Sequence, residues 1–293
     1  MTDTIDPAYR ALAAEQEPEI MPFDAARLGE VRANRRAVMG RLQGRLATVS
    51  VTRDAGGATF VPEGARKGHI LYAHGGGWTV GDSQTHGAIM SDLAGASGLT
   101  LVGPDYPLAP EHPWPAALDA LEAPAVELAA AGPLVLAGDS AGGNLALGLA
   151  LLLKDLGVKV AGMILFYGCY RRVFDTESHR AFGDGRVGLS TEAMRTYWDL
   201  YLSGADGWPD GDFAPLEGPA FKGLPPAFVG DAGLDVLRDD GAWLEARLRG
   251  AGVPVERQVV PGVPHGFLHQ CGRYDPAFAL IEAAGRFAAR VTG

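Results

Sequence analysis

Cysteine is scarce in this chain of 293 residues, which holds only Cys169 and Cys271. Two cysteines outside any C-x-x-C pair cannot form a disulfide framework, so we expect two buried, reduced thiols. Basic residues are also in the minority, with 25 Lys and Arg against 35 Asp and Glu and a formal net charge of −10. An acidic surface repels phosphates and anionic headgroups, so neither nucleic acid nor a membrane is an expected partner.

Long hydrophobic runs are missing as well. The longest, Leu145 to Leu153, is interrupted by Gly148 and is too short to cross a bilayer. Residues 1–22 carry several acids and lack the basic-then-apolar order of a signal peptide. With 47% apolar and 20% charged residues, the chain has the composition of a globular enzyme of one large or two small α/β domains. We expect a cytoplasmic location, and a homodimer is kept as an open alternative to a monomer.

Glycine, by contrast, is abundant, with 41 residues, and one cluster carries chemistry. Residues 138–143 read G-D-S-A-G-G; the apolar run Leu134 to Ala137 precedes them, and Asn144 to Leu153 follow with a helical pattern. A Ser with Gly two residues away on either side, on a sharp strand-to-helix turn, is typical of a nucleophile elbow. The small neighbours leave room for a strained turn that presents the Ser140 hydroxyl.

Strand-like and helix-like segments alternate along most of the chain. Expected strands cover residues 47–53, 58–62, 69–73, 99–103, 134–137, 160–167, 227–230 and 255–260. Expected helices cover residues 84–97, 115–131, 144–153, 239–250 and 275–291. The alternation predicts an α/β fold with a mostly parallel central sheet of about eight strands and helices on both faces.

The alternation breaks between Tyr167 and Ala227, a gap of about sixty residues and far more than a simple crossover needs. Within it, Ser190 or Thr191 can cap a helix on which Met194, Tyr197, Trp198 and Tyr201 recur at helical spacing. That face indicates either ordinary helix packing or an insertion whose rings line a pocket. We carry Trp78, Tyr197, Trp198 and Tyr201 forward as candidate pocket residues.

A serine hydroxyl needs a base to become nucleophilic, and the base needs an acid that orients it. In the α/β-hydrolase order the acid and then the His follow the Ser, each on a loop after a later strand. Asp231 and Asp235 both follow the strand at 227–230, and we favour Asp235, which is farther along the loop. Asp239 and Asp240 fit better as first-turn acids of the next helix.

His265 follows the last expected strand and is the candidate base, with His269 four residues later. This pair is a weak metal signal, because no H-E-x-x-H motif and no third ligand accompany it. We therefore expect no metal and no cofactor.

A developing oxyanion must also be held. Residues 74–78 read H-G-G-G-W and directly follow the strand that ends at Ala73. Such a loop contributes backbone N–H groups to an oxyanion hole, as does the residue after the nucleophile, here Ala141. The candidates are Gly75, Gly76, Gly77 and Ala141, as donors or their supports. No phosphate-binding glycine motif is present in this loop, and His74 fits better as a brace than as a base.

Taken together, H-G-G-G-W and G-D-S-A-G-G resemble the bacterial hormone-sensitive-lipase family of α/β-hydrolase carboxylesterases. The block Asp105 to Ala117, D-Y-P-L-A-P-E-H-P-W-P-A-A, strengthens this resemblance, although Pro107 stands where the family usually has Arg. The family's D-P-L-R-D-E corresponds to residues 235–240, which supports Asp235, and its H-G-F corresponds to residues 265–267.

The resemblance spans roughly residues 67–270 and implies domain boundaries. It predicts a catalytic domain of residues 46–170 and 221–293, an N-terminal helical cap segment of residues 1–45 and a cap insertion of residues 171–220.

The predicted function is that of a serine carboxylesterase acting on small-molecule esters through Ser140, His265 and Asp235. The resemblance favours short acyl chains, from acetyl to about hexanoyl, and Gly76 and Gly77 as first oxyanion donors. Two alternatives stay open: an amidase or aryl formamidase with the same triad, and a non-catalytic ligand-binding protein on the hydrolase fold, against which the presence of His265 argues.

Overall fold

A central eight-stranded sheet organises residues 4–16, 19–46, 48–204, 209–218 and 221–293, which are those that the computed structural model describes. The spatial order is β1-β2-β4-β3-β5-β6-β7-β8. Pairs β1–β2 and β2–β4 are antiparallel and the other pairs are parallel. The strands are β1 (Val49–Asp54), β2 (Gly57–Pro62), β3 (Arg66–Ala73), β4 (Leu99–Pro104), β5 (Leu134–Asp139), β6 (Gly162–Phe166), β7 (Ala227–Leu234) and β8 (Val255–Pro264).

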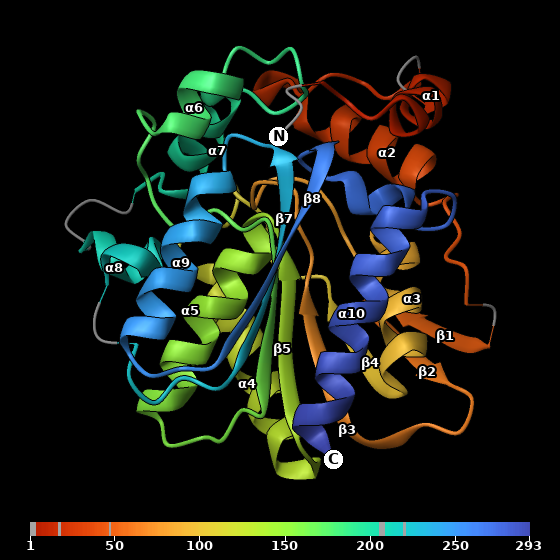
Figure 1. The fold of residues 1–293 in the computed structure, drawn as a ribbon, viewed down its shortest axis with the longest axis vertical. Coiled ribbons are helices and arrows are strands. Elements are labelled where there is room, and N and C mark those ends of the chain that lie inside the picture. The colour runs from red at the N-terminus through yellow and green to blue at the C-terminus, as the bar shows by residue number, and fades with distance from the viewer. Residues whose placement is uncertain (1–3, 17–18, 47, 205–208, 219–220) are drawn as a thin grey trace.

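Helices cover both faces of this sheet (Figure 1). One face packs against α3 (Gly87–Ser97) and α10 (Asp275–Thr292), and the other against α4 (Ala116–Ala131), α5 (Ala141–Asp155) and α9 (Arg238–Gly250). Helix α5 is apolar almost all round and β5 is buried along its whole length. A strand and helix of that kind are stable only in the middle of the molecule, which is where the register puts them.

The register between β3 and β5 determines which two loops lie next to each other at the edge of the sheet. Ala73, the last residue of β3, pairs with Gly138 near the end of β5. Because the two strands are parallel, the loop after Ala73 and the turn after Asp139 emerge side by side at the carboxyl edge of the sheet.

Apart from η4 (Phe267–Gln270), which lies between β8 and α10, the remaining helices come from two separate segments of the chain. The first holds α1 (Pro7–Gln16), η2 (Ala25–Arg27) and α2 (Leu28–Met39), and the second holds α6 (Glu177–Phe182), α7 (Thr191–Tyr201), α8 (Asp210–Phe213) and η3 (Pro215–Glu217). In Figure 1, α1, α2, α6 and α7 lie at the end of the sheet toward which the arrows of β7 and β8 point. Of the two candidate caps, Ser190 and not Thr191 caps α7, and the Ser190 hydroxyl accepts a hydrogen bond from the Ala193 N–H.

The expected strands and helices are confirmed in type and order, with shifted ends. Strands β7 and β8 run on to Leu234 and Pro264, so Asp231 lies inside a strand and not on a loop as expected. Helix α3 begins at Gly87, later than expected. The first predicted strand includes Ala47, which lies outside the described residues, as do parts of the predicted segments 1–45 and 171–220. No described helix is long and apolar enough to span a membrane.

Candidate active site

The turn at Ser140 is strained and tightly packed. Ser140 has φ 54° and ψ −122°, between the end of β5 and the start of α5, and its N–H donates to the Phe166 carbonyl at 2.9 Å. A Cβ on Gly138 would lie 2.2 Å from the Gly142 carbonyl oxygen, and one on Gly142 would lie 2.0 Å from that of Ala73. Only glycine fits at either position, and the backbone so held presents the Ser140 side chain at the sheet edge.

Ser140, His265 and Asp235 lie in one hydrogen-bonded row. His265 Nε2 is 2.8 Å from Ser140 Oγ, and His265 Nδ1 is 2.7 Å from Asp235 Oδ2. Asp235 follows β7 and His265 follows β8, so two neighbouring parallel strands deliver the acid and the imidazole to the same edge. The side chain of Asp235 is fully buried, and its Oδ1 also accepts from the Leu237 N–H at 2.9 Å, which fixes the carboxylate in place.

The other acids of this loop are used elsewhere. Asp231 lies on β7 and pairs with Arg257 at 2.7 Å, while burial raises its pKa to about 7. Asp239 and Asp240 lie in the first turn of α9. Asp239 accepts from the Ser178 N–H, and Asp240 accepts from the N–H groups of Tyr170 and Arg171. Of the candidate acids, only Asp235 therefore reaches His265.

The backbone N–H groups of the glycine loop differ in whether they already have a hydrogen-bond acceptor. The Gly75 N–H donates to Asp139 Oδ1 at 3.0 Å, so it cannot also serve an oxyanion and Gly75 can act only as a support. The N–H groups of Gly76, Gly77 and Ala141 have no acceptor within the described residues. They form the set of donors left for a substrate oxygen beside Ser140.

His74 lies beneath this loop and not beside Ser140. Its Nδ1 is 2.8 Å from the Gly75 carbonyl oxygen and its ring stacks on Tyr106 with centroids 4.1 Å apart. Burial, with the charge of the nearby His86, lowers the pKa of His74 to about 4. A neutral, buried imidazole in these contacts fits the bracing role expected from the sequence.

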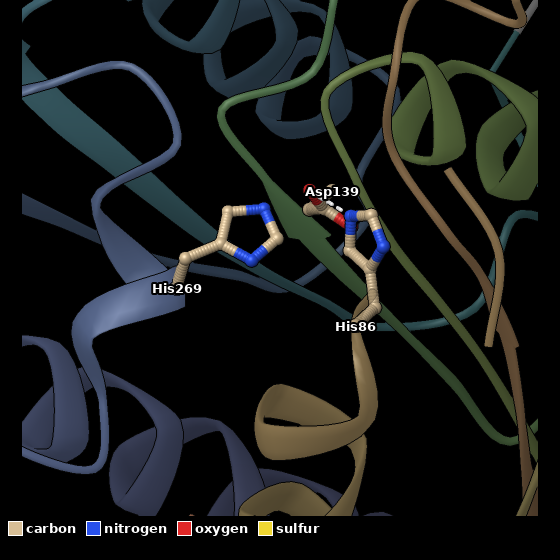
Figure 2. A group of neighbouring side chains, drawn as sticks. All are labelled: His86, Asp139 and His269. Atoms are coloured by element: carbon tan, nitrogen blue, oxygen red, sulfur yellow. Dashed lines mark ion pairs between the residues drawn. The ribbon is translucent and has the colours of Figure 1, made fainter. Parts of the chain in front are cut away.

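A second polar cluster, which sequence reasoning missed, adjoins the nucleophile. Figure 2 shows His86 and His269 facing Asp139 from two elements, His86 just before α3 and His269 on η4 (Phe267–Gln270). His86 Nε2 lies 3.5 Å from Asp139 Oδ2, and Tyr72 donates to Asp139 Oδ1 at 2.8 Å. Burial opposes charge on both partners, yet their mutual attraction raises the pKa of His86 and holds that of Asp139 well below its usual range. Each of the two groups therefore favours the charged form of the other.

The donor atoms of His86, Asp139 and His269 lie within 4.8 Å of one another, the one such group in the described part of the chain. The contacts disfavour a cation there, because Asp139 Oδ1 already accepts two hydrogen bonds and Oδ2 faces His86 Nε2 at 3.5 Å, and a metal would have to displace the proton that Asp139 favours on His86. This cluster contains His269 but not His265, so it differs from the His265/His269 pair that the sequence analysis considered as a weak metal signal. We interpret it as the brace that holds Gly75.

A cavity of about 540 Å³ opens beside Ser140, and residues of α1, α2 and α7 line it. Trp78 and Tyr197 line this cavity as predicted, but Trp198 and Tyr201 do not. Both are fully buried behind Trp78, with ring centroids 4.5 Å and 4.1 Å from it. The apolar face of α7 is wide enough that Met194 and Tyr197 reach the cavity while Trp198 and Tyr201 pack into the core.

The N-terminal segment supplies a wall that sequence reasoning did not predict. Tyr9 of α1, Phe23, and Arg35 and Met39 of α2 line the cavity, and the Phe23 ring lies 4.4 Å from that of Tyr197. The resemblance predicted a helical cap segment at residues 1–45, but not which of its side chains face the cavity.

Arg32 ties α2 to the loop after β4. Its guanidinium donates to the carbonyls of Thr79 and Ala109 and to both Glu111 oxygens. The hydrogen bond from Arg32 lowers the pKa of Glu111 to about 2. A guanidinium thus reaches the block that carries Pro107, although it comes from another part of the chain.

Comparisons with known proteins agree with this architecture. A family model described as the alpha/beta hydrolase fold matches residues 70–269. An acetyl esterase of Salmonella paratyphi B is 31% identical over 239 residues, which cover 78% of this chain and 74% of that protein.

Two solved structures extend the likeness to the whole chain. A thermostable esterase from Pseudomonas putida ECU1011 has a TM-score of 0.90 at 27% identity, covering 100% of this chain and 99% of that one. An esterase from the bacterial hormone-sensitive lipase family has a TM-score of 0.88 at 26% identity, covering 98% and 99%. The chain therefore belongs to the α/β-hydrolase family, among the carboxylic ester hydrolases related to bacterial hormone-sensitive lipase.

Proposed function

We propose that this protein hydrolyses short-chain acyl esters, with Ser140 as nucleophile, His265 as general base and Asp235 as the residue that orients the imidazole. The observation that carries the proposal is the position of His265, whose two ring nitrogens lie 2.8 Å from Ser140 Oγ and 2.7 Å from Asp235 Oδ2. A base must lie within hydrogen-bond reach of the proton it takes, and this spacing meets that condition.

In the acylation step, Ser140 Oγ attacks the ester carbonyl carbon while its proton passes to His265 Nε2. The carbonyl oxygen becomes an oxyanion, for which the N–H groups of Gly76, Gly77 and Ala141 are the donors. When the intermediate collapses, the C–O bond to the alcohol breaks and His265 returns the proton to the leaving oxygen. Water then attacks the acyl-serine by the same route, and the acid and free Ser140 result.

Asp235 and Asp139 have supporting roles in this proposal. Asp235 accepts the Nδ1–H of His265 and stabilises the imidazolium that forms during each transfer. Asp139 holds the Gly75 N–H, which fixes the start of the oxyanion loop before substrate arrives. Residues 1–45 and 171–220 act as the cap over the 46–170 and 221–293 catalytic domain.

The preference for short acyl chains is supported by the name of the relatives, acetyl esterase, and by the aromatic walls of a cavity of about 540 Å³. A series of p-nitrophenyl esters from acetate to palmitate tests it. We expect kcat/KM to be highest between acetate and hexanoate, and a maximum at palmitate would contradict the proposal. Ser140→Ala should abolish turnover while its thermal unfolding stays that of the parent; retained turnover would rule out Ser140 as nucleophile.

Three further points belong to the proposal. Comparison of matched esters and amides decides between an esterase and an amidase with the same residues. A cytoplasmic location is supported by the two buried free thiols, Cys169 and Cys271. A homodimer stays an alternative to a monomer, and sedimentation velocity separates them.

A further inference from the structure

Three arginine side chains line the cavity beside Ser140, in a protein whose net charge is −10. Arg10, Arg35 and Arg186 are among the lining residues, while Asp139 is the only carboxylate among those described. The Asp139 charge is already opposed by His86 at 3.5 Å. The described lining of the cavity therefore holds more cationic than anionic side chains, in a chain of net negative charge.

Arg35 stands out from the other arginines of its helix. On α2, Arg32 binds Glu111 and two backbone carbonyls, and Arg36 binds Asp82 at 2.5 Å. Arg35 lies between them in sequence, but it has no ion pair or hydrogen bond with any described residue, and its Nε is fully buried without a partner. A buried N–H without an acceptor costs free energy, so Arg35 Nε favours an oxygen ligand in the cavity that it lines.

Arg35 lines the same cavity as Ser140 and Gly76. Burial and the charges of His86 and Arg35 lower the pKa of His269 to about 3, so Arg35 lies within electrostatic reach of that ring. The charge of Arg35 also acts on Tyr197, whose ring packs against Gly77 so closely that a Cβ there would lie 2.2 Å from it. Arg35 thus lies near residues that adjoin both the oxyanion loop and the cluster around Asp139.

From these contacts we propose that the cavity selects an ester that carries a carboxylate, with Arg35 as the counter-ion of that carboxylate. This inference rests on the proposed ester hydrolysis at Ser140. The planar guanidinium offers N–H donors that match the two oxygens of a carboxylate, which would satisfy the buried Nε. Arg10, exposed and with no ion pair to a described residue, adds attraction at the rim, whereas Arg186 is already held by Asp184.

The expected substrates are half-esters of dicarboxylic acids or O-acyl derivatives of hydroxy acids, depending on which side of the ester bond faces Arg35. Two matched pairs of one anionic and one neutral ester distinguish these two substrate classes. Monoethyl adipate against ethyl hexanoate puts the charge on the acyl side, and 4-acetoxybutyrate against butyl acetate puts it on the alcohol side. Rates are followed by pH-stat titration at low and high ionic strength.

For one of the two pairs we expect kcat/KM of the anionic ester to exceed that of the neutral ester by about 10- to 100-fold, as a charge-assisted hydrogen bond gives. Added salt should reduce this ratio. Arg35→Gln should lower kcat/KM of the anionic ester far more than that of the neutral ester and so abolish the ratio, and Arg35→Lys should restore part of it. Arg27→Gln removes an equal charge from an exposed Arg–Glu pair outside the cavity and should keep the parent ratio.

Equal or slower hydrolysis of both anionic esters by the parent would overturn the inference, as would a ratio that survives Arg35→Gln; either result means that Arg35 is merely hydrated. If no ester is hydrolysed, the proposed function fails instead. Calorimetry with Ser140→Ala then still tests the subsite. Binding of an anionic ester that is lost in the Ser140→Ala, Arg35→Gln double variant supports the subsite, and equal binding by both variants refutes it.

Discussion

Gly142→Ala tests whether the tight contact between the elbow and the glycine loop matters as argued. A Cβ at position 142 would lie 2.0 Å from the carbonyl oxygen of Ala73 and 2.7 Å from that of His74. Both atoms belong to the backbone, so no side chain can rotate away and the end of β3 must move. Relief of the Ala73 contact alone needs a shift of about 1 Å.

Two effects follow from that shift. Overpacking a well-packed core costs about 1–3 kcal/mol of unfolding free energy. The moving segment leads directly into Gly76 and Gly77, and a misplacement of about 1 Å at a catalytic site can lower the rate by about 10²-fold. We therefore expect Gly142→Ala to lose both stability and kcat/KM on p-nitrophenyl acetate.

Gly148→Ala is the matched control, because it lies on the same helix and its nearest neighbour would be Leu118 Cδ1 at 3.7 Å, an ordinary contact. Alanine there should stabilise the protein by about 0.5–1 kcal/mol through helix propensity, with unchanged turnover. Urea unfolding and initial rates measure both variants side by side. If Gly142→Ala were as stable and as active as Gly148→Ala, the reasoning about the elbow would be refuted.

Three further substitutions have expected outcomes. Asp235→Asn should lower kcat by about 10³- to 10⁴-fold in ester hydrolysis, because the amide no longer selects the productive imidazole tautomer; a loss below tenfold would speak against Asp235. Tyr197→Ala should move the acyl-chain optimum in the p-nitrophenyl series toward longer chains. Trp198→Ala should instead cost about 3–5 kcal/mol of unfolding free energy without moving that optimum. Identical optima in both variants would contradict the assignment of the cavity wall. His86→Gln should lower the free energy of unfolding most below about pH 6.5, where His86 is charged in both the folded and the unfolded protein. The loss should shrink as pH rises through the raised pKa of His86 in the folded protein. A loss in urea unfolding that does not change with pH would argue against the attraction between His86 and Asp139.

Much of the fold follows from local patterns in the sequence. The apolar runs and glycine turns predicted the strands and helices in their order, since each β–α unit carries its own signal. The ends of β7 and β8 were missed because the longer strands are set by pairing with each other and not by local residues. That is also why Asp231 was placed on a loop.

The candidate site likewise has a part that the sequence predicts and a part that it does not. The order Ser140, Asp235, His265 follows from chain topology, and the structure brings these three side chains within hydrogen-bond distance. The pocket walls could not be predicted, because helical spacing shows that the α7 face is apolar but not which member reaches the cavity. The docking of α2, and with it Arg35, depends on tertiary contacts of a segment with no recognisable motif.

Covalent labelling with a fluorophosphonate, followed by mass spectrometry of the digested protein, tests the central claim most directly. An activated serine attacks the phosphorus and displaces fluoride, which leaves a stable adduct. We predict one equivalent of adduct, on the peptide that contains Ser140, and none in Ser140→Ala. An unlabelled protein, or an adduct on any other residue, would contradict the account.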